Sequence, residues 1–406
     1  MSRVRLNLCG HGTVLKGVKM KAGVGSSILA DARAAGKEAA QKAAAGLPDL
    51  RMAYVYASCD YDVEAMLAGV KEALPGIPLI GNTSFTGVIT PEGFISGPDG
   101  FVGVMAVSDP EMAVGIASVT NSGDPQADGR KAAELAIQKA GKTGAPDYFY
   151  MAAPPGAEEY FLKGITEIIG RAPFFGGSAA DNTIEGNWKL WTDAGTFADG
   201  VAVAFFYTDK KMTNKYTGAY HETGDMGIIT KVINDRTLAE IDGTPALQKY
   251  ADWRGLSTDE LMGGALLAAS IISPLGVKDR LGDLVAIRHP MNGNDDLTLN
   301  VGNKLSTGTA IIRMECTVDE LIASTGETLA ALKEKAGGSI AAFHLVHCGG
   351  RRAGIDARIG EAAAAIRKEA GDIPFLCEFT FGEYGFEQDG CNTCGGLMLS
   401  FTAFAE

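Results

Sequence analysis

Hydrophobic and polar positions follow one order of elements that recurs three times along the chain. Residues 52–59 form an apolar run rich in aromatic and β-branched side chains, which predicts a strand. Apolar residues then recur from Val63 to Leu74 at the spacing of one helix face. Short strands at 77–81 and 101–107 complete the unit, which therefore reads β-α-β-β.

The second copy starts with a strand at 147–154 and continues with apolar helix positions between Phe161 and Ile169. Its closing strands cover 172–177 and 201–207, and the third copy places strands at 342–348, 373–377 and 397–401. Alignment of the copies gives equivalent positions, each three residues after a proline: Gly81, Gly176 and Cys377 follow Pro78, Pro173 and Pro374. The pattern thus predicts an internal repeat.

The predicted fold class is α+β, with repeated β-α-β-β units forming two mixed-sheet modules whose facing loops enclose one cleft. The segment 224–332 fits the repeat poorly. It predicts a strand–turn–strand around Asn234 and Asp235 and a helix that begins at Pro245. We place the module boundary in the polar stretch 208–216, which divides the chain into modules 1–215 and 216–406.

Composition and charge narrow the classes of partner. The 406 residues are 46% hydrophobic and 21% charged, as in globular proteins, and the net charge is −13. An acidic chain without a basic stripe repels phosphate backbones, so we expect no nucleic-acid partner. The longest apolar run, 261–272, is too short to span a bilayer, and no secretion signal precedes the first strand. We expect a cytoplasmic protein with reduced thiols and no membrane partner.

Several short motifs, in the right order, resemble the FIST proteins. The N-terminal module matches at 23–27, 61–62 and 78–87, and the C-terminal module matches at 241–247, 348–351, 381–385 and 392–393. The resemblance implies a sensory module that binds small ligands such as amino acids or their derivatives. FIST modules are often fused to an output domain, so the resemblance also implies a separate signalling output partner here. Some relatives look like haem-binding nitric oxide sensors.

Candidate ligand-binding residues follow the strand ends, where strand–helix–strand folds usually bind ligands. Arg351 and Glu383 could clamp a zwitterion, or they could form a structural ion pair between two loops. The family motif adds Asn392 and Thr393. The polar residues behind two strand-end glycines could line a pocket or form Asx and Ser turns; they are Asn82, Thr83, Ser178 and Asp181.

Four cysteines are the candidate metal ligands: Cys348, Cys377, Cys391 and Cys394. The last two form a Cys-x-x-Cys, and the repeat places the first two at the ends of neighbouring strands. Converging thiolates would suit zinc or an iron–sulfur cluster, whereas isolated cysteines are often small buried apolar residues. Cys377 and Cys391 also stand where the resembling family more often has Gly and His.

Five histidines are formally available as axial haem ligands, namely His11, His221, His289, His344 and His347. Haem therefore enters only through the family resemblance. The leading hypothesis is a small-ligand sensor for an amino-acid-like or carboxylate ligand that lacks its own output domain. The alternatives are a metal- or thiol-dependent enzyme that uses the cysteine cluster, and a haem-binding nitric oxide sensor. Whether the protein is an enzyme stays open.

Overall fold

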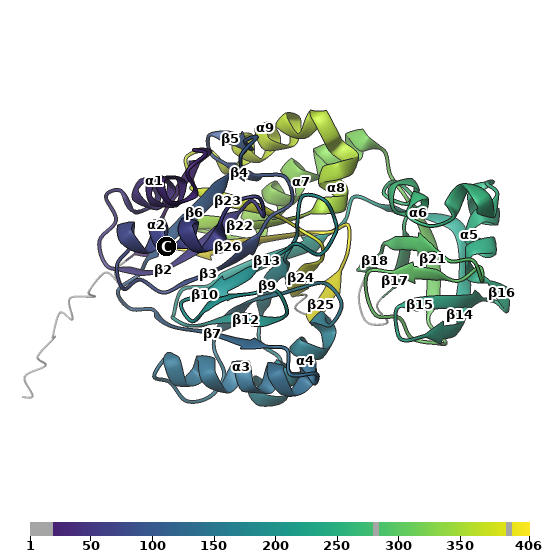
Figure 1. Ribbon diagram of the computed structural model, residues 1–406, viewed down its shortest axis with the longest axis horizontal. Helices are drawn as coiled ribbons and strands as arrows, with labels where there is room; N and C mark the ends of the chain where they lie inside the picture. The colour runs from purple at the N-terminus through teal and green to yellow at the C-terminus, as the bar shows by residue number, and fades with distance from the viewer. Residues whose placement is uncertain (1–18, 279–283, 387–391) are drawn as a thin grey trace, which may run out of the picture.

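The computed structural model describes residues 19–278, 284–386 and 392–406. They fold into three six-stranded sheets, one eight-stranded sheet and the helices that cover them, so the α+β class with mixed sheets is confirmed. Three repeats form the larger body of the molecule, and an inserted sheet projects from it on one side (Figure 1). Among the described residues, no helix is long and apolar enough to cross a membrane.

Each repeat contains more than the predicted β-α-β-β unit, because a strand and a helix precede it. The first repeat consists of β1 (Lys21–Ser27), α1 (Ala32–Ala44), β2 (Leu50–Ala57), α2 (Val63–Ala73), β3 (Leu79–Thr83), β4 (Val88–Thr90), β5 (Gly93–Ile95) and β6 (Val102–Ser108). The second consists of β7 (Ala113–Thr120), α3 (Pro125–Lys139), β8 (Tyr148–Ala153), α4 (Glu158–Ile169), β9 (Phe174–Ser178), β10 (Leu190–Thr192), β11 (Gly195–Phe197) and β12 (Gly200–Tyr207).

The third repeat follows the same order but is interrupted after its first strand. It consists of β13 (Met212–Thr217), α7 (Val318–Ala336), β22 (Ile340–Cys348), α8 (Gly349–Ile355), η2 (Asp356–Arg358), α9 (Ile359–Ala370), β23 (Phe375–Thr380), β24 (Glu383–Phe386), β25 (Asn392–Gly395) and β26 (Leu399–Ala405). The predicted repeat is therefore confirmed. The predicted division into modules 1–215 and 216–406 stays a prediction.

The insertion between β13 and α7 forms the eight-stranded sheet. Its elements are β14 (His221–Ile233), β15 (Thr237–Ile241), β16 (Thr244–Pro245), α5 (Ala246–Arg254), η1 (Thr258–Leu261), α6 (Ala265–Ala269), β17 (Leu275–Lys278), β18 (Val285–Arg288), β19 (Pro290–Gly293), β20 (Leu299–Val301) and β21 (Ala310–Glu315). The predicted turn around Asn234 and Asp235 is confirmed, and both residues have the positive φ that a tight hairpin needs. The predicted helix is confirmed as α5, with Pro245 at its N-cap.

The three repeats exchange their hairpins in a cycle. The sheet orders are β1-β6-β2-β3-β10-β11, β7-β12-β8-β9-β24-β25 and β13-β26-β22-β23-β4-β5. The hairpin β4–β5 of the first repeat thus completes the sheet of the third, β10–β11 of the second completes the first, and β24–β25 of the third completes the second. In all three sheets the two central strands are parallel and their neighbours antiparallel.

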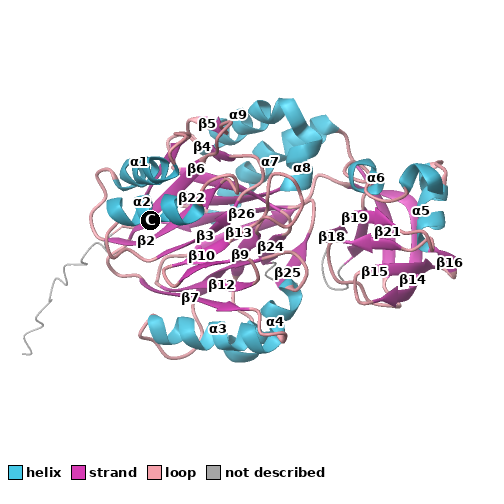
Figure 2. Cartoon of the chain, viewed as in Figure 1, coloured by secondary structure: helices cyan, strands magenta, loops and turns pink. Residues whose placement is uncertain are grey.

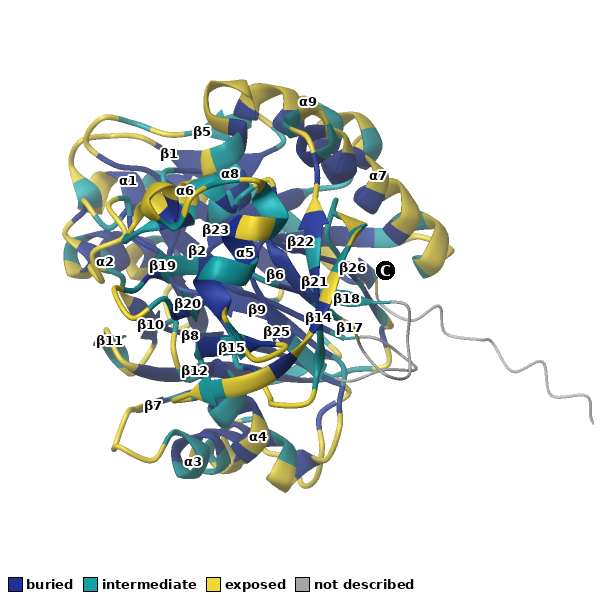
Figure 3. Cartoon of the chain, turned by 90° about the vertical axis from the view of Figure 1, so that its right-hand side faces the viewer, coloured by how far each residue is buried: buried dark blue, intermediate teal, exposed yellow. Residues whose placement is uncertain are grey.

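The three sheets surround one core and carry their helices on the outside. Side chains of all three sheets meet in this central cluster, including Tyr54, Tyr150 and Leu376. Helices α1 and α2, α3 and α4, and α7 and α9 each cover the outer face of one sheet (Figure 2). The outward faces of these helices are exposed while the strands are buried (Figure 3). Each of the three six-stranded sheets is therefore covered on both faces, which explains its nearly continuous apolar strands.

Proline and glycine positions explain how the repeats align. The carbonyl oxygens of the three equivalent prolines accept backbone hydrogen bonds of 2.9–3.0 Å from Ala53, Phe149 and Phe343. A Cβ atom on Gly81 would lie 1.7 Å from Val55 O and 2.7 Å from the Trp191 ring, so the close approach requires glycine. The equivalent Cys377 lies opposite Ile89, a smaller side chain than Trp191.

Candidate functional site

A cleft of about 420 Å³ lies where the inserted sheet meets the repeat body. We call it the junction cleft. Its lining comes from helix α4 and the loop that follows it, from β18, from the loop after β20, and from β25. The lining residues are Glu159, Leu162, Lys163, Thr166, Arg171, Arg288, Lys304, Asn392, Thr393 and Cys394. Figure 1 shows β18 on the side of the insertion that faces α4 and β25. The size is that of a small-molecule site.

Cations dominate the lining of the junction cleft. Among the described lining residues, four cations (Lys163, Arg171, Arg288 and Lys304) accompany one carboxylate, that of Glu159. Lys304 also pairs with Asp235 at 3.0 Å. The Arg288 guanidinium donates to the carbonyl oxygens of Lys304 at 3.2 Å and Cys394 at 3.4 Å, and the described residues give it no ion pair. Burial lowers the pKa of Arg288, although the charge of Glu159 opposes the shift. An anionic ligand would therefore find a partly desolvated cation here.

The predicted ligand residues Asn392 and Thr393 line this cleft. The Asn392 side chain donates from Nδ2 to the carbonyl oxygen of Ala172 at 2.9 Å. That bond fixes the amide orientation and leaves Oδ1 buried without a described partner. The cleft thus offers one unfilled acceptor beside its cations.

A buried network beside the cleft joins the insertion to the repeat body. Arg236, in the hairpin between β14 and β15, pairs with Glu158 at 2.8 Å and with Glu159. Glu158 begins α4, is 1% exposed, and accepts from Ser178 Oγ at 3.1 Å. Ser178 in turn lies 2.8 Å from Tyr384 Oη. Burial and the charge of Glu159 raise the pKa of Glu158 to about 7, while Arg236 opposes the shift.

Two other predicted ligand residues, Ser178 and Asp181, already make hydrogen bonds within the protein. Ser178 is fully buried and holds Glu158, so the described contacts give it a structural partner. Asp181 accepts five backbone N–H groups from the loop 183–187, an Asx-type anchor. Their predicted contact with a ligand stays a prediction.

Arg351 and Glu383 are both fully buried and do not form the ion pair that was one expectation. Arg351 Nη2 donates to Leu321 O at 3.0 Å and to Ser324 Oγ at 2.6 Å. The Glu383 oxygens accept from Thr380 Oγ1 at 3.0 Å and from the Met398 N–H at 2.8 Å. Burial raises the pKa of Glu383 to about 8. The zwitterion clamp stays a prediction.

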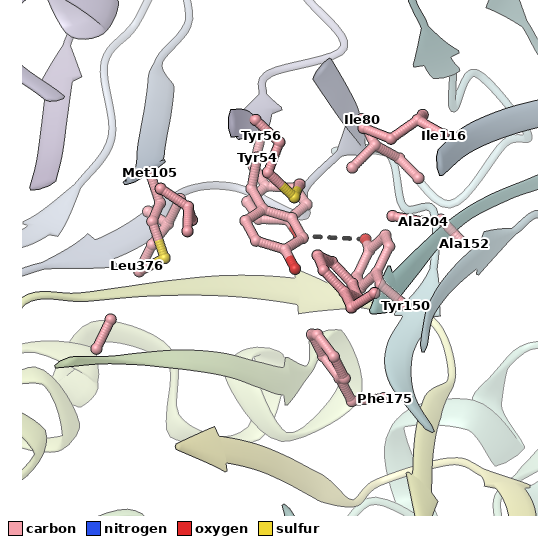
Figure 4. Packing of buried hydrophobic residues seen from close by; sticks show 14 of the residues in the cluster. Tyr54, Tyr56, Ile80, Met105, Ile116, Tyr150, Ala152, Phe175, Ala204 and Leu376 are labelled. Carbon is pink, nitrogen blue, oxygen red and sulfur yellow. Dashed lines mark hydrogen bonds between the residues drawn. The ribbon is translucent and has the colours of Figure 1, made fainter. Parts of the chain in front are cut away.

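Asn82 belongs to a buried polar network at the centre of the three sheets. Its Nδ2 donates to Glu378 at 2.8 Å, and its Oδ1 accepts from Tyr150 Oη at 3.1 Å. Tyr56 Oη lies 3.2 Å from Tyr150 Oη, the contact drawn in Figure 4. The neighbouring Thr83 exchanges hydrogen bonds with the backbone of Lys189. Asn82 and Thr83 are both fully buried, and neither is among the residues that line the junction cleft.

The described residues do not support the predicted cysteine cluster. Cys348, Cys377 and Cys394 pack in three different hydrophobic clusters, and Cys391 lies outside the described residues. Within the described ranges, no group of three His, Cys, Asp or Glu side chains could hold a metal ion. Burial raises the pKa of all three described thiols well above its usual value, so each stays protonated at neutral pH. The physical reason lies in the strand register: Cys377 is opposite Leu345 and Cys348 opposite Thr380, so the two side chains point to opposite faces of one sheet. Cys394 lies on β25, in another sheet.

The described histidines do not fit a haem. The rings of Tyr54, Tyr150 and Phe175 surround His344 at centroid distances of 4.7, 5.5 and 5.2 Å, which leaves no room for a porphyrin. His347 Nδ1 donates to the carbonyl oxygen of Cys348 at 3.0 Å, and the His347 ring packs 5.2 Å from Phe379. His289 is held at Leu267 O, His221 is exposed beside Glu320, and His11 lies outside the described residues.

Sequence reasoning missed the cationic side of the cleft. Arg288 and Lys304 lie in the insertion, about which the repeat carries no information, and they meet α4 only through the fold. One signal was present: Arg288 directly follows the apolar residues 284–287 and ends strand β18. Charges in such a position are seldom buried without a partner.

Comparison with protein-family models identifies two domains in this chain. The FIST N domain matches residues 51–244 and the FIST C domain matches residues 246–385. The chain therefore belongs to the FIST family, whose domains are generally sensory domains that bind small ligands. A search of curated proteins finds no match.

Solved structures give only distant likenesses. Cyanuric acid hydrolase from A. caulinodans is 10% identical with a TM-score of 0.32, covering 95% of this chain and 100% of that one. Phosphoribosylformylglycinamidine synthase II from Thermotoga maritima is 10% identical with a TM-score of 0.23, covering 95% and 72%. Thiamine monophosphate kinase from Aquifex aeolicus is 11% identical with a TM-score of 0.16, covering 48% and 90%. These TM-scores are too low to inform the fold or function of this chain.

Proposed function

We propose that this FIST protein is a sensor that binds a small carboxylate, of the amino-acid type, in the junction cleft. The observation that carries the proposal is the charge of the lining. The chain as a whole has a net charge of −13, yet the described lining of this cleft includes Lys163 and Arg288, two cations to which the described residues give no ion pair. Concentrating positive charge against the overall balance favours an anionic ligand, which the surrounding field would otherwise repel.

The polar groups of the cleft favour a ligand that also carries an N–H donor. The ligand carboxylate would contact Arg288 and Lys163, and its ammonium group would donate to Asn392 Oδ1 or to Glu159. Thr393 could donate to or accept from the ligand. This arrangement is the zwitterion recognition expected from the sequence, with Arg288 in place of Arg351.

A ligand in this position touches both the repeat body and the insertion. Lys163 and Asn392 belong to the body, whereas Arg288 and Lys304 belong to the insertion. Binding would therefore favour the arrangement in which the two parts are held together, and a separate output protein would respond to that change. A thiol-dependent enzyme is the weaker alternative, because the described buried thiols are held protonated.

The test is a thermal-shift and calorimetric screen with amino acids, the matching deaminated carboxylates and the matching amines. We expect amino acids to bind, carboxylates to bind more weakly, and amines not to bind. Lys163→Gln should weaken binding, because Lys163 is exposed, lines the cleft and makes no described ion pair. Lys131→Gln, on the neighbouring helix α3 and away from the cleft, is the matched control. Equal binding by both variants would remove the cleft as the site.

A further inference from the structure

The Arg351 guanidinium is a buried cation with most of its hydrogen-bonding capacity unused. The side chain is 0% exposed, and its two described hydrogen bonds both come from Nη2. Nε and Nη1, which together carry three of the five guanidinium N–H bonds, have no partner within the described structure. A buried charge in this state is costly unless another group compensates it.

The neighbouring side chains do not neutralise Arg351. The groups whose protonation its charge influences are Tyr220, Cys316, His347 and Glu383. Among these four groups Glu383 is the carboxylic acid, and its two oxygens already accept hydrogen bonds from Thr380 and Met398. The described residues give no ion pair between Glu383 and Arg351. Burial raises the pKa of Glu383 to about 8, so this carboxyl group is mostly neutral at pH 7.

Arg351 lies directly behind the wall of a surface cleft. A second cleft of about 570 Å³ lies between the end of β13 and helix α7, and Ser324 and Tyr220 line it. Ser324 Oγ accepts from Arg351 Nη2 at 2.6 Å, so the guanidinium lies one side chain behind the wall of that cleft.

We propose that Arg351 binds a small monovalent anion of halide size, held by its Nε–H and Nη1–H groups inside the third repeat. An ordered water could satisfy the same donors but would leave the charge uncompensated. A halide supplies both an acceptor and a counter-charge. This anion site is independent of the junction cleft, since Arg351 is not among the residues that line it.

The first experiment is thermal unfolding of the full chain in sodium chloride, sodium bromide and sodium gluconate at equal ionic strength. We expect Tm to rise with halide concentration by about 2 °C or more and then to level off, with little change in gluconate. Arg351→Met should abolish the halide effect. The matched control is Arg352→Met, whose side chain packs over Phe94 at 4.9 Å and should keep the effect.

A second measurement does not depend on a variant that folds. Crystals of the wild-type protein grown or soaked in bromide should show an anomalous peak within hydrogen-bond distance of Arg351 Nε or Nη1. The proposal fails if halide and gluconate give the same Tm, if Arg351→Met keeps the halide effect, or if bromide shows no peak there. Any of these results would leave a water as the occupant, and the proposed function of the junction cleft would be untouched.

Discussion

The hydroxyl oxygen of Tyr56 lies 2.5 Å from Nε2 of His344, although 288 residues separate the two in the chain. Tyr56 comes from the first repeat and His344 from the third, and the bond lies in the core that the three sheets share. Burial lowers the pKa of His344 to about 3, so its ring is neutral. Tyr56 donates its hydroxyl proton to Tyr150 Oη, so His344 Nε2–H is the donor and Tyr56 Oη the acceptor of this bond. The contact therefore ties the first repeat to the last.

Replacing Tyr56 should destabilise the protein, whereas replacing its neighbour Tyr54 should not. Tyr56→Phe leaves His344 Nε2 buried without a partner, which should cost about 2 kcal/mol of unfolding free energy in urea titrations. Tyr54 is equally buried, but its hydroxyl has no described partner. Tyr54→Phe should therefore be neutral or slightly stabilising. Equal losses in the two variants would contradict the assigned hydrogen bond.

Glu378 should make stability fall as pH rises from about 4.5 to 8. Burial raises the pKa of Glu378 from 4.5 to about 8 in the folded protein, so the folded state keeps a proton that the unfolded chain releases. Its contribution to stability is complete below pH 4.5 and is lost on the way to pH 8. Glu378→Gln should reduce the slope of unfolding free energy against pH by about 1.4 kcal/mol per pH unit in that window.

The matched control for this pH series is Glu361→Gln. Glu361 is exposed on α9, and its hydrogen bonds to Arg358 lower its pKa. Its titration therefore lies below pH 4.5, and the slope between pH 5 and 8 should stay that of the wild type. A wild-type slope in Glu378→Gln would mean that Glu378 is ionised in the fold.

Arg236 should hold the insertion against the repeat body. Arg236→Gln leaves Glu158 buried without its cation, which should cost about 3 kcal/mol of unfolding free energy at pH 8. The loss should shrink at pH 6, because Glu158, whose pKa is about 7, can then take up a proton. Arg358→Gln removes two exposed ion pairs, with Asp319 and Glu361, and should change little. Proteolysis of the folded protein would also report the loss, as faster cleavage near 218–220.

Gly81 should tolerate no side chain. Gly81→Ala places a methyl group against Val55 O, a backbone atom that cannot move aside, and should cost about 3 kcal/mol or more. Gly360→Ala is the control: its Cβ would meet nothing within 4 Å inside helix α9, so helix propensity should stabilise the variant by about 0.5–1 kcal/mol. Folding of Gly81→Ala with wild-type stability would contradict the close strand approach.

The sequence pattern predicted the repeats because strand and helix periods are local properties. The prolines before Gly81, Gly176 and Cys377 carry enough information to align them, and the structure confirms this alignment. The first strand and helix of each repeat were not assigned to the unit. Alanine-rich helices such as α1 show weak apolar contrast, so their periodicity is faint.

The candidate site was predicted less well because it depends on contacts between distant segments. Asn392 and Thr393 could be chosen from a family motif, and both line the junction cleft. The repeat placed Cys348 and Cys377 on neighbouring strands, but the strands direct Cys348, Cys377 and Cys394 into three different cores. Arg288 could not be connected with Lys163, since 125 residues of chain and one sheet insertion have to be folded before the two meet.

The exchange of hairpins sets an order on how the nascent chain can mature. When β9 leaves the ribosome, the strand that will pair with its open edge, β24, is still about 200 residues from being synthesised. The edge strand β9 of the second sheet therefore stays unpaired and prone to aggregation while the entire insertion is translated. The hairpin β24–β25, the last to be synthesised, thus completes the exchange among the three sheets. A chain truncated before residue 383 lacks the strands that complete its second sheet.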